Sequence, residues 1–490
     1  MIFSAISVIF FFTLCIHQRD KVWRFFQRKT KRLTGPNDHI FGGYITLVKL
    51  WDLGKLLETL VEWSRKYGPV FQFKLGFYRI ISLNSPEMIQ KLLSSSNSSH
   101  LSKPFIYDVL KPFLIDGLLL SRGDKWRYRR KAVNKHLFSY GTLLSYTKIF
   151  NEESDNLLKI LEERVKSNTD KNAMPIDDIM SSSSLNVISQ IVLGKPLHFF
   201  AEANNENIIV DLVRKAKAIV TMKIFKPWLM FYPIWRLHPL YQTEKEALKL
   251  HRYVVERCTA PSEGNDEDFL FKKDLETDGV SPDGIIEEAL AILVAGYETA
   301  ASGIQFLLFF LALHPNHQDI CRKEMDEVFG ELENGFITIS ALKNLKYLEM
   351  CLYETLRILP PVPIFMRKLE TPLELDSNLT LPTNSVVGIH VQAIHKNPKY
   401  YPNPEQFIPE RFSEEERSRR HPYAYLAFSA GVRNCIGNKF AMMEMVLVAA
   451  KILRRYVVST TDKLEDIVFL PHMTISMESP INFLLEPRTL

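Results

Sequence analysis

The chain has 490 residues, of which 46% are hydrophobic and 24% charged, so it can bury a large core and has the balance of an ordinary globular protein. Its net charge of +5 is small and no long basic run follows the N-terminal region, which argues against a nucleic-acid-binding protein. The five cysteines are odd in number and form no C-x-x-C pair, which argues against a disulfide framework or a structural zinc site and fits a reducing compartment.

The first expected element is an N-terminal membrane anchor over residues 1–18. Residues 1–16 carry no charge and are mostly isoleucine, phenylalanine, leucine and valine, and a basic block follows up to Arg32. A cleaved signal peptide normally has a charged start and a small-residue cleavage site, and this segment has neither. Because basic flanks stay cytosolic, we expect an endoplasmic reticulum anchor (1–18), a basic linker (19–36) and a cytosolic domain (37–490).

Beyond the anchor, the sequence predicts mainly helices with small sheets in one unit. Residues 70–83 alternate enough to suggest a hairpin, and residues 124–257 and 315–358 have the pattern of amphipathic helices. Residues 373–395 and 468–485 favour short strands, whereas the polar, acidic residues 259–278 favour a surface loop. No internal repeat and no Gly/Ser-rich or Pro-rich linker divides this region into separate domains.

One long apolar helix is expected from Ser281, where Ser-Pro-Asp makes a good helix start, to about Leu313. Between Ala289 and Leu313 the only charged residue is Glu298. By itself this segment is a candidate membrane span, but a carboxylate in mid-span is costly in lipid. Together with the cysteine loop described next, it is better explained as a core helix.

The most informative stretch is Phe428 to Gly437, which follows the pattern F-x-x-G-x-R-x-C-x-G around Cys435. Cysteine thiolate is one of the few axial ligands of haem iron, and glycines let the backbone approach a flat cofactor closely. Backbone amides at the start of the following helix can stabilise a thiolate, and Arg433 can pair with a haem propionate. A lone cysteine is more often a buried structural residue, but this spacing favours the haem site.

This pattern resembles the cysteine loop of the cytochrome P-450 family, the haem-thiolate monooxygenases, and the resemblance covers nearly the whole chain. It implies a mainly α fold with small β-sheets, and Cys435 as the axial ligand of a haem b iron. Ala295 to Thr299 is similar to the family's A-G-x-E-T pattern. The resemblance implies that Gly296 leaves room for O2, that Glu298 relays protons and that the Thr299 hydroxyl steadies a water. The plainer alternative for Thr299 is a hydrogen bond back to its own helix.

Two further groups of residues follow from the resemblance. The first is a buried structural network behind the cysteine loop, formed by Glu354 and Arg357 of an E-x-x-R pair with Arg411. The second is a set of cofactor-binding residues, in which Trp126 and Arg130 serve one propionate, Arg433 and Arg367 serve the other, and Phe428 and Gly437 belong to the loop itself.

The phrases around residues 421–426 and 440–445 look like the branch that includes fatty-acid ω-hydroxylases. Many members of that branch have a glutamate before the helix glycine, where it can esterify the haem, but this chain has Ala295 there. We therefore expect non-covalent haem. Residues expected to line the substrate pocket are Phe105, Ile106, Ala295, Val362 and Ile364, and the aromatic and cationic residues between 219 and 237 suggest contact with a membrane interface.

The expected function is that of a membrane-bound monooxygenase, an oxidoreductase that inserts one atom of O2 into an apolar substrate such as a fatty acid, another lipid or a xenobiotic. Electrons from NADPH would arrive through a separate cytochrome P-450 reductase, with cytochrome b5 as an additional partner. The expected docking surface is a basic face of Arg127, Arg129, Lys131 and Lys439. Two alternatives remain: a haem-thiolate isomerase or dehydratase that needs no O2, which the Glu298–Thr299 pair disfavours, and a haem sensor, for which no output domain is visible.

Overall fold

The structure is a computed structural model that describes residues 33–36, 52–75, 78–94, 102–168, 172–195, 208–259, 270–330 and 335–488. The predicted anchor and most of the basic linker lie outside the described residues. Among the described helices, one is long and apolar enough to cross a membrane, Pro282–Leu313, and 67% of its most apolar window is buried inside the protein. This burial is expected for the core helix that the sequence suggested.

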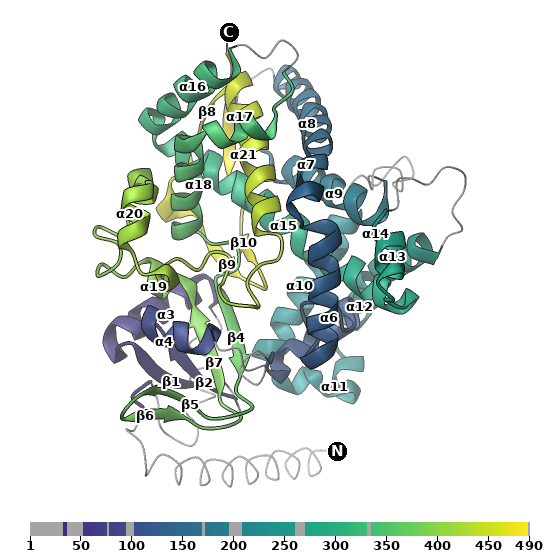
Figure 1. The fold of residues 1–490 in the computed structure, drawn as a ribbon, viewed down its shortest axis with the longest axis vertical. Coiled ribbons are helices and arrows are strands. Elements are labelled where there is room, and N and C mark those ends of the chain that lie inside the picture. The colour runs from purple at the N-terminus through teal and green to yellow at the C-terminus, as the bar shows by residue number, and fades with distance from the viewer. Residues whose placement is uncertain are drawn as a thin grey trace.

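Helices make up most of the molecule and fill its upper and right-hand parts in Figure 1, whereas the largest sheet lies at the lower left, with the first two described helices beside it. The helices, in chain order, are α3 (Leu53–Tyr67), α4 (Pro86–Leu93), α5 (Lys111–Leu114), α6 (Gly123–Leu137), α7 (Tyr140–Ser145), α8 (Thr147–Ser167), α9 (Asp177–Leu193), α10 (Ile208–Phe225), α11 (Tyr232–Arg236), α12 (Tyr241–Ala247), α13 (Lys249–Thr259), α14 (Leu270–Thr277), α15 (Pro282–Leu313), α16 (Pro315–Phe329), α17 (Ile339–Asn344), α18 (Lys346–Ile358), α19 (Val391–His395), α20 (Glu414–Arg419) and α21 (Asn438–Arg455).

The strands form small sheets, as the sequence predicted. They are β1 (Val70–Leu75), β2 (Tyr78–Leu83), β3 (Met174–Pro175), β4 (Ile364–Lys368), β5 (Leu373–Asp376), β6 (Leu379–Leu381), β7 (Val386–His390), β8 (Tyr456–Ser459), β9 (Phe469–Pro471), β10 (Ile475–Met477) and β11 (Asn482–Pro487). The largest sheet has the order β1-β2-β7-β4, with β2 and β7 parallel and the other neighbours antiparallel. The predicted hairpin over 70–83 is confirmed as β1 and β2.

Two local predictions were wrong. Residues 270–277 form α14 where a surface loop was expected, because Phe271 and Leu275, four residues apart, bury themselves in the core while the charged residues between them face outward. The predicted strand-rich patch ends early, because Val391–His395 turns into the short helix α19 directly after β7. In both places a few buried side chains outweigh the average polarity or β-propensity of the segment.

Helix α15 is the centre of the fold. Its N-cap Ser281 accepts a hydrogen bond from the Gly284 amide, and Pro282 occupies the first turn, where its missing N–H costs nothing. The helix packs on α9, α21, α18 and α13, and most of its length is buried. The oxygen-side residues of the predicted site therefore lie on a rigid, internal element (Figure 1).

Helix α21 carries a buried carboxyl group, Glu444, whose Oε1 has no hydrogen-bond partner within the described residues. Burial raises the pKa of Glu444 to about 8, although its hydrogen bond with Ser184 acts in the opposite direction. Because the folded-state pKa lies above that of the unfolded chain, the acid form favours folding at low pH. This contribution is lost as the pH rises towards about 8.

We therefore expect Glu444→Gln to gain stability relative to the native protein as the pH rises. The difference in unfolding free energy should grow by about 1.4 kcal/mol per pH unit between about pH 5 and 8. Urea titrations at several pH values measure it, with Glu415→Gln on the exposed face of α20 as the control. A pH-independent difference for Glu444→Gln would contradict a buried, protonated carboxyl.

Candidate functional site

The cysteine loop is a tight turn that leads directly into α21. The Cys435 amide donates to the Phe428 carbonyl at 2.9 Å, which closes the loop, and Gly437 is the N-cap of α21. Gly431 has φ +72°, and a Cβ there would lie 2.1 Å from the Leu93 carbonyl oxygen, so only glycine fits. The side chain of Cys435 remains exposed within this turn.

Opposing influences act on the Cys435 thiol. Enough protein surrounds it that burial raises its pKa, whereas a hydrogen bond from the Gly437 amide and the positive charge of Arg130 lower it. Arg130 itself belongs to α6 and donates to the Asn434 carbonyl at 2.9 Å and to Asn434 Oδ1 at 2.7 Å. The structure thus brings Arg130 against the cysteine loop, where it stabilises a thiolate over a thiol.

Trp126 and Arg433 meet beside this loop. The Arg433 guanidinium lies 4.1 Å from the centre of the Trp126 ring and donates to the Ser121 carbonyl at 2.7 Å. Its Nε and Nη1 atoms have no hydrogen-bond partner within the described residues. Trp126 is buried, so this cation–π pair lines a part of the site from which water is largely excluded.

Arg433 is part of a buried cluster of cations with Lys103 and Arg367. Lys103 and Arg367 are 8% and 1% exposed. Burial and then repulsion from Arg367 and Arg433 hold the pKa of Lys103 well below its usual value, and burial together with Arg367 lowers the pKa of Arg433. Within the described residues no carboxylate forms an ion pair with any of the three, and Arg367 Nε is also unpartnered.

Such a cluster is unstable without an anion, because buried charges of one sign repel each other and desolvation penalises each of them. Haem carries two propionate carboxylates, and a thiol beside this cluster can supply the iron ligand. The arrangement of Cys435, Arg433, Arg367 and Lys103 therefore fits haem in both charge and ligand chemistry.

The centre of α15 carries the residues expected on the oxygen side. A Cβ at Gly296 would lie 2.9 Å from Ile188 Cγ1 of α9, so this glycine also lets the two helices approach closely. The Thr299 hydroxyl donates to the Ala295 carbonyl at 2.9 Å, which is the bond to its own helix that the plainer alternative foresaw. Glu298 forms an ion pair with Lys217 of α10.

The E-x-x-R residues form the expected buried network. Arg357 donates through Nε and Nη2 to the two carboxylate oxygens of Glu354 at 2.6 and 2.8 Å, and both side chains are fully buried. Arg411 Nε lies 3.4 Å from Glu354 Oε1. Arg357 also donates to the His395 carbonyl at 2.9 Å, and Glu354 accepts from the Ile408 amide, so the network joins α18, α19 and the segment before the cysteine loop.

Comparison with known proteins agrees with this geometry. The family model described as cytochrome P450 matches residues 34–485, which is most of the chain. The chain belongs to the cytochrome P450 family. It is 31% identical over 452 residues to "Cytochrome P450 4V2" of Homo sapiens, covering 87% of this chain and 84% of that protein. It is also 29% identical over 512 residues to "Cytochrome P450 4c21" of Blattella germanica, covering 99% of both, and 27% identical to "Cytochrome P450 4c3" of Drosophila melanogaster.

Membership of the cytochrome P450 family confirms the resemblance that the cysteine loop suggested, and with it the fold class. The protein is a monooxygenase oxidoreductase that uses a haem with a cysteine-thiolate ligand, O2 and electrons derived from NADPH. This assignment favours the monooxygenase over the O2-independent enzyme and the haem sensor.

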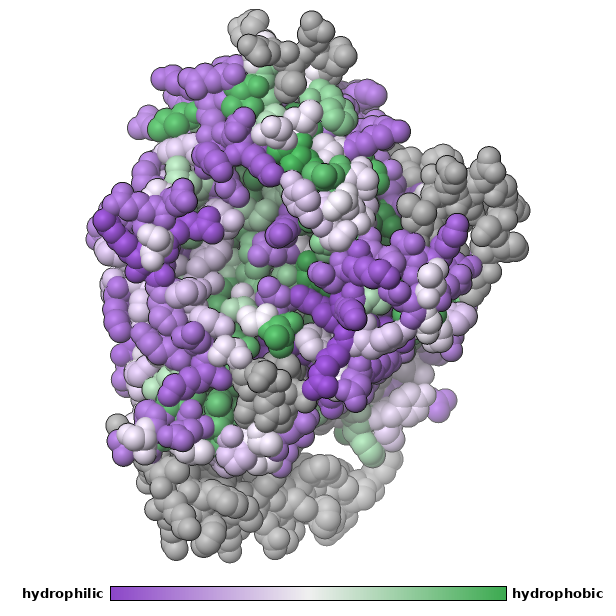
Figure 2. Space-filling model, viewed as in Figure 1, coloured by the Kyte–Doolittle hydropathy of each residue, from purple (hydrophilic) through white to green (hydrophobic). Residues whose placement is uncertain are grey.

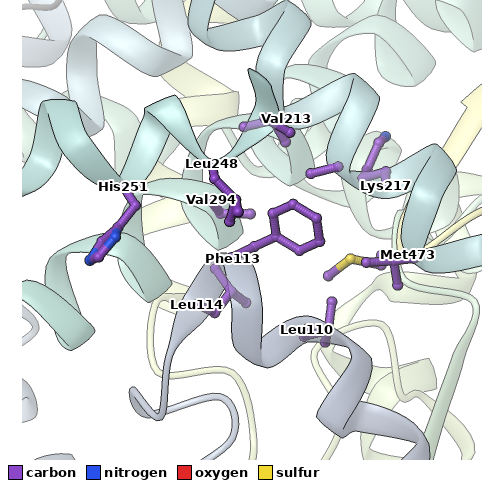
Figure 3. Close-up of a pocket in the computed structure, with 12 residues that line it drawn as sticks. Leu110, Phe113, Leu114, Val213, Lys217, Leu248, His251, Val294 and Met473 are labelled. Atoms are coloured by element: carbon purple, nitrogen blue, oxygen red, sulfur yellow. The ribbon is translucent and has the colours of Figure 1, made fainter. Parts of the chain in front are cut away.

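The residues expected in the substrate pocket are dispersed in the structure. Ala295 is exposed in the middle of α15, Val362 and Ile364 are half-buried around the start of β4, Ile106 is buried, and Phe105 is 40% exposed and packs on Tyr78. A small, partly open cavity lies nearby (Figure 3) and has none of these five in its lining. Its walls come from α5, α10, α12, α13 and α15 with the β9–β10 turn, and include Leu110, Phe113, Val213, Lys217, Val294 and Met473.

Sequence reasoning missed two residues of the site, Lys103 and Lys217. Both are buried lysines, and lysine is almost never fully buried without a partner, so their burial is itself informative. Nothing in the local sequence distinguishes them, because the charged groups around them come from distant segments: the cations Arg367 and Arg433 beside Lys103, and the carboxylate of Glu298 beside Lys217.

Proposed function

We propose that this cytochrome P450 hydroxylates an apolar, lipid-like substrate such as a fatty acid. The observation that carries this proposal is the cavity beside Val294 of α15, whose lining is almost entirely apolar and which lies next to the Gly296–Thr299 segment. A mostly apolar cavity with few polar groups favours hydrocarbon ligands. The similarity to cytochromes P450 of type 4 supports the same class.

The test is reconstitution of the purified holoprotein with a cytochrome P-450 reductase, NADPH and a panel of fatty acids, sterols and xenobiotics. We expect oxygenated product from the fatty acids or other lipids, dependent on both NADPH and reductase, and a spectral shift on binding of the same compounds. Turnover confined to polar compounds would contradict the proposal, as would product formation without NADPH.

We propose that Cys435 ligates the iron and that Arg433, Arg367, Lys103, Trp126 and Arg130 hold the propionate side, with Phe428 and Gly437 shaping the loop. When bound, the haem supplies the chemistry that activates O2. The chain's own contribution is to hold the thiolate with the Gly437 amide, to neutralise the propionates, and to keep Gly296 close against Ile188 beside the oxygen side. In this proposal Glu298 relays protons from solvent to the oxygen side, and the Thr299 hydroxyl orients a water there.

Lys103→Met is expected to weaken haem retention, because it removes one of three buried cations that fit the propionates. Hydrogen bonds between charged partners contribute about 1.5–3 kcal/mol, which corresponds to a roughly 10- to 100-fold faster loss of haem. Transfer of haem to excess apomyoglobin measures that rate. Lys451→Met is the matched control. Lys451 lies in the C-terminal half of α21 and is as buried as Lys103, but it forms an ion pair with Asp155 of α8. Equal rates in the two variants would contradict the assignment of Lys103.

The haem is expected to be non-covalent, because Ala295 has no carboxyl group with which to form an ester. Acid acetone should extract all of the haem from the native protein, as measured by the haem absorbance left on the precipitate. An Ala295→Glu variant is expected to retain a fraction of it after turnover. Haem that stays on the denatured native protein would contradict this prediction.

We further propose that an acidic reductase docks over α6. Arg127 and Lys131 are exposed on α6, and Lys439 is exposed in the first turn of α21. Figure 2 shows hydrophilic side chains gathered over α6. Arg129, which the sequence placed on the same face, does not belong to it: its side chain is buried and pairs with Glu288 at 3.0 Å. The three remaining cations would attract an acidic reductase, and salt screens this attraction. We therefore expect added salt to slow the reduction of the haem protein by the reductase. Cytochrome b5, another acidic donor, would use the same face.

A second surface supports the proposed location at the endoplasmic reticulum membrane. Between α10 and α12 the chain exposes large apolar side chains: Trp228, Phe231, Tyr232, Ile234 and Leu237. Aromatic residues next to cations such as Arg236 are typical of a membrane interface. We propose that this surface rests on the membrane and that residues 1–18 anchor the protein there, with 19–36 as linker and 37–490 as the catalytic haem-binding domain in the cytosol.

A further inference from the structure

A buried polar cluster ties the centre of α15 to α10 and to the β9–β10 turn. Lys217 of α10 forms its ion pair with Glu298 and also donates to Thr474 Oγ1 at 3.1 Å and to Ser476 Oγ at 2.9 Å. The Thr474 hydroxyl donates in turn to Glu298 Oε2 at 2.9 Å. Lys217 is only 4% exposed, so the cluster is largely shielded from bulk water.

The donors of Lys217 are all used within this cluster. An ammonium group has three N–H bonds, and here the three acceptors are Glu298, Thr474 and Ser476. Figure 3 shows Lys217 at the edge of the apolar cavity, near Met473. Although Lys217 borders this cavity, its charge is already satisfied by the protein, so it does not serve as the anchor for a charged group of a substrate.

The same contacts fix where the Glu298 carboxylate lies. Glu298 and Thr299 are adjacent on α15, and adjacent residues of a helix do not face each other. The Thr299 hydroxyl donates to carbonyls of its own helix, whereas the Glu298 carboxylate is held by side chains from α10 and the β9–β10 turn. Without Lys217, the partly buried Glu298 carboxylate would keep the Thr474 hydroxyl as a donor and lose its counter-ion.

We propose that Lys217 is a positioning residue for proton delivery: it holds the Glu298 carboxylate in one place and orientation beside the oxygen side of the haem. The inference rests on the role proposed above for Glu298. Thr474 shares the task, since it contacts both Lys217 and Glu298. A small displacement of a group that handles protons is enough to slow a reaction markedly.

A purely structural role for Lys217 is the competing explanation, and α10 provides its own control. Lys223 lies on the same helix, is similarly buried, and forms a 2.5 Å ion pair with Glu244 of α12. Among the described residues, neither Lys223 nor Glu244 forms a hydrogen bond or ion pair with Glu298. Lys223→Met therefore removes a buried lysine of α10 from its carboxylate partner without touching Glu298.

The experiment compares Lys217→Met, Lys217→Arg, Lys223→Met and Glu298→Gln as holoproteins. The main readout is product formed per NADPH consumed, with released peroxide measured in parallel. Denaturation midpoints and the carbon-monoxide spectrum report on stability and on the haem independently of turnover. We expect Lys217→Met to lower product per NADPH by at least about fivefold. The rate of product formation, kcat, should fall as well, while KM and the spectrum stay unchanged. This loss is smaller than the roughly 100- to 10,000-fold rate effect typical of a residue that itself transfers the proton. Lys217→Arg should restore most of the loss, and Lys223→Met should destabilise the protein without lowering product per NADPH.

The outcomes separate this inference from the function on which it rests. If Glu298→Gln lowers product per NADPH but Lys217→Met does not, the role of Lys217 is overturned and that of Glu298 stands. If neither variant lowers it, the proposed role of Glu298 fails and the inference fails with it. If Lys217→Met and Lys223→Met lower product per NADPH equally, Lys217 has only a structural role.

Discussion

Cys435→Ser is expected to abolish the far-shifted Soret band that the reduced carbon-monoxide adduct of a haem-thiolate protein shows. A serine hydroxyl is a poor substitute for a thiolate, and the loop offers no other sulfur. Because losing even a residue that merely orients a metal ligand costs about 10–100-fold in affinity or activity, we expect monooxygenase activity to fall by at least about 100-fold. The spectrum and the turnover rate are measured on the same preparation.

The control is Cys258→Ser, which changes a buried cysteine of α13, away from the cysteine loop. This variant should keep the native spectrum and activity. If the shifted Soret band survives in Cys435→Ser but disappears in Cys258→Ser, the iron ligand is not Cys435. The other site assignments would then lose their basis.

Arg357→Ala is expected to give protein that neither holds haem stably nor folds with native stability. Arg357 is fully buried, and its removal leaves the Glu354 carboxylate buried. Arg411, 3.4 Å away, is then the one ion-pair partner left to it in the described part of the chain. Breaking a buried ion pair by removing one partner costs about 3–5 kcal/mol. That is a large part of the stability of a typical protein, about 5–15 kcal/mol, so haem content should fall as well.

Urea denaturation and the ratio of haem to protein measure these two effects. Arg419→Ala is the control, because Arg419 pairs with Glu415 and Glu416 on the surface of α20, where exposed pairs contribute about 0–1 kcal/mol. A well-folded Arg357→Ala protein with a full complement of haem would show that the network is dispensable.

Local patterns in the sequence were enough to predict much of this protein. The spacing around Cys435, the alternation over 70–83 and the apolar run through α15 are each contained in a short stretch, so their structure follows from neighbours along the chain. Even the Glu354–Arg357 pair is visible in sequence, because residues three apart share a face of a helix.

What the sequence could not reveal depends on residues that meet only after folding. Lys103 becomes informative because Arg367 and Arg433 approach it from distant segments, and Lys217 because α10 crosses Glu298. Arg129 shows the converse: its sequence neighbours are exposed cations, but its own side chain turns inward to Glu288. Burial and long-range pairing, which decide these cases, are properties of tertiary packing.

The β9–β10 turn has a consequence for the synthesis of the protein. Thr474, which donates to Glu298 in the middle of α15, lies 176 residues further along the chain, and Ser476 accepts from Lys217. Strand β11 then pairs with both β3 and β8. The ribosome must therefore extend the chain past residue 476 before the central helix meets these supports. A polypeptide terminated before Thr474 would leave that helix without this contact, so we expect such truncations to yield protein that quality control removes.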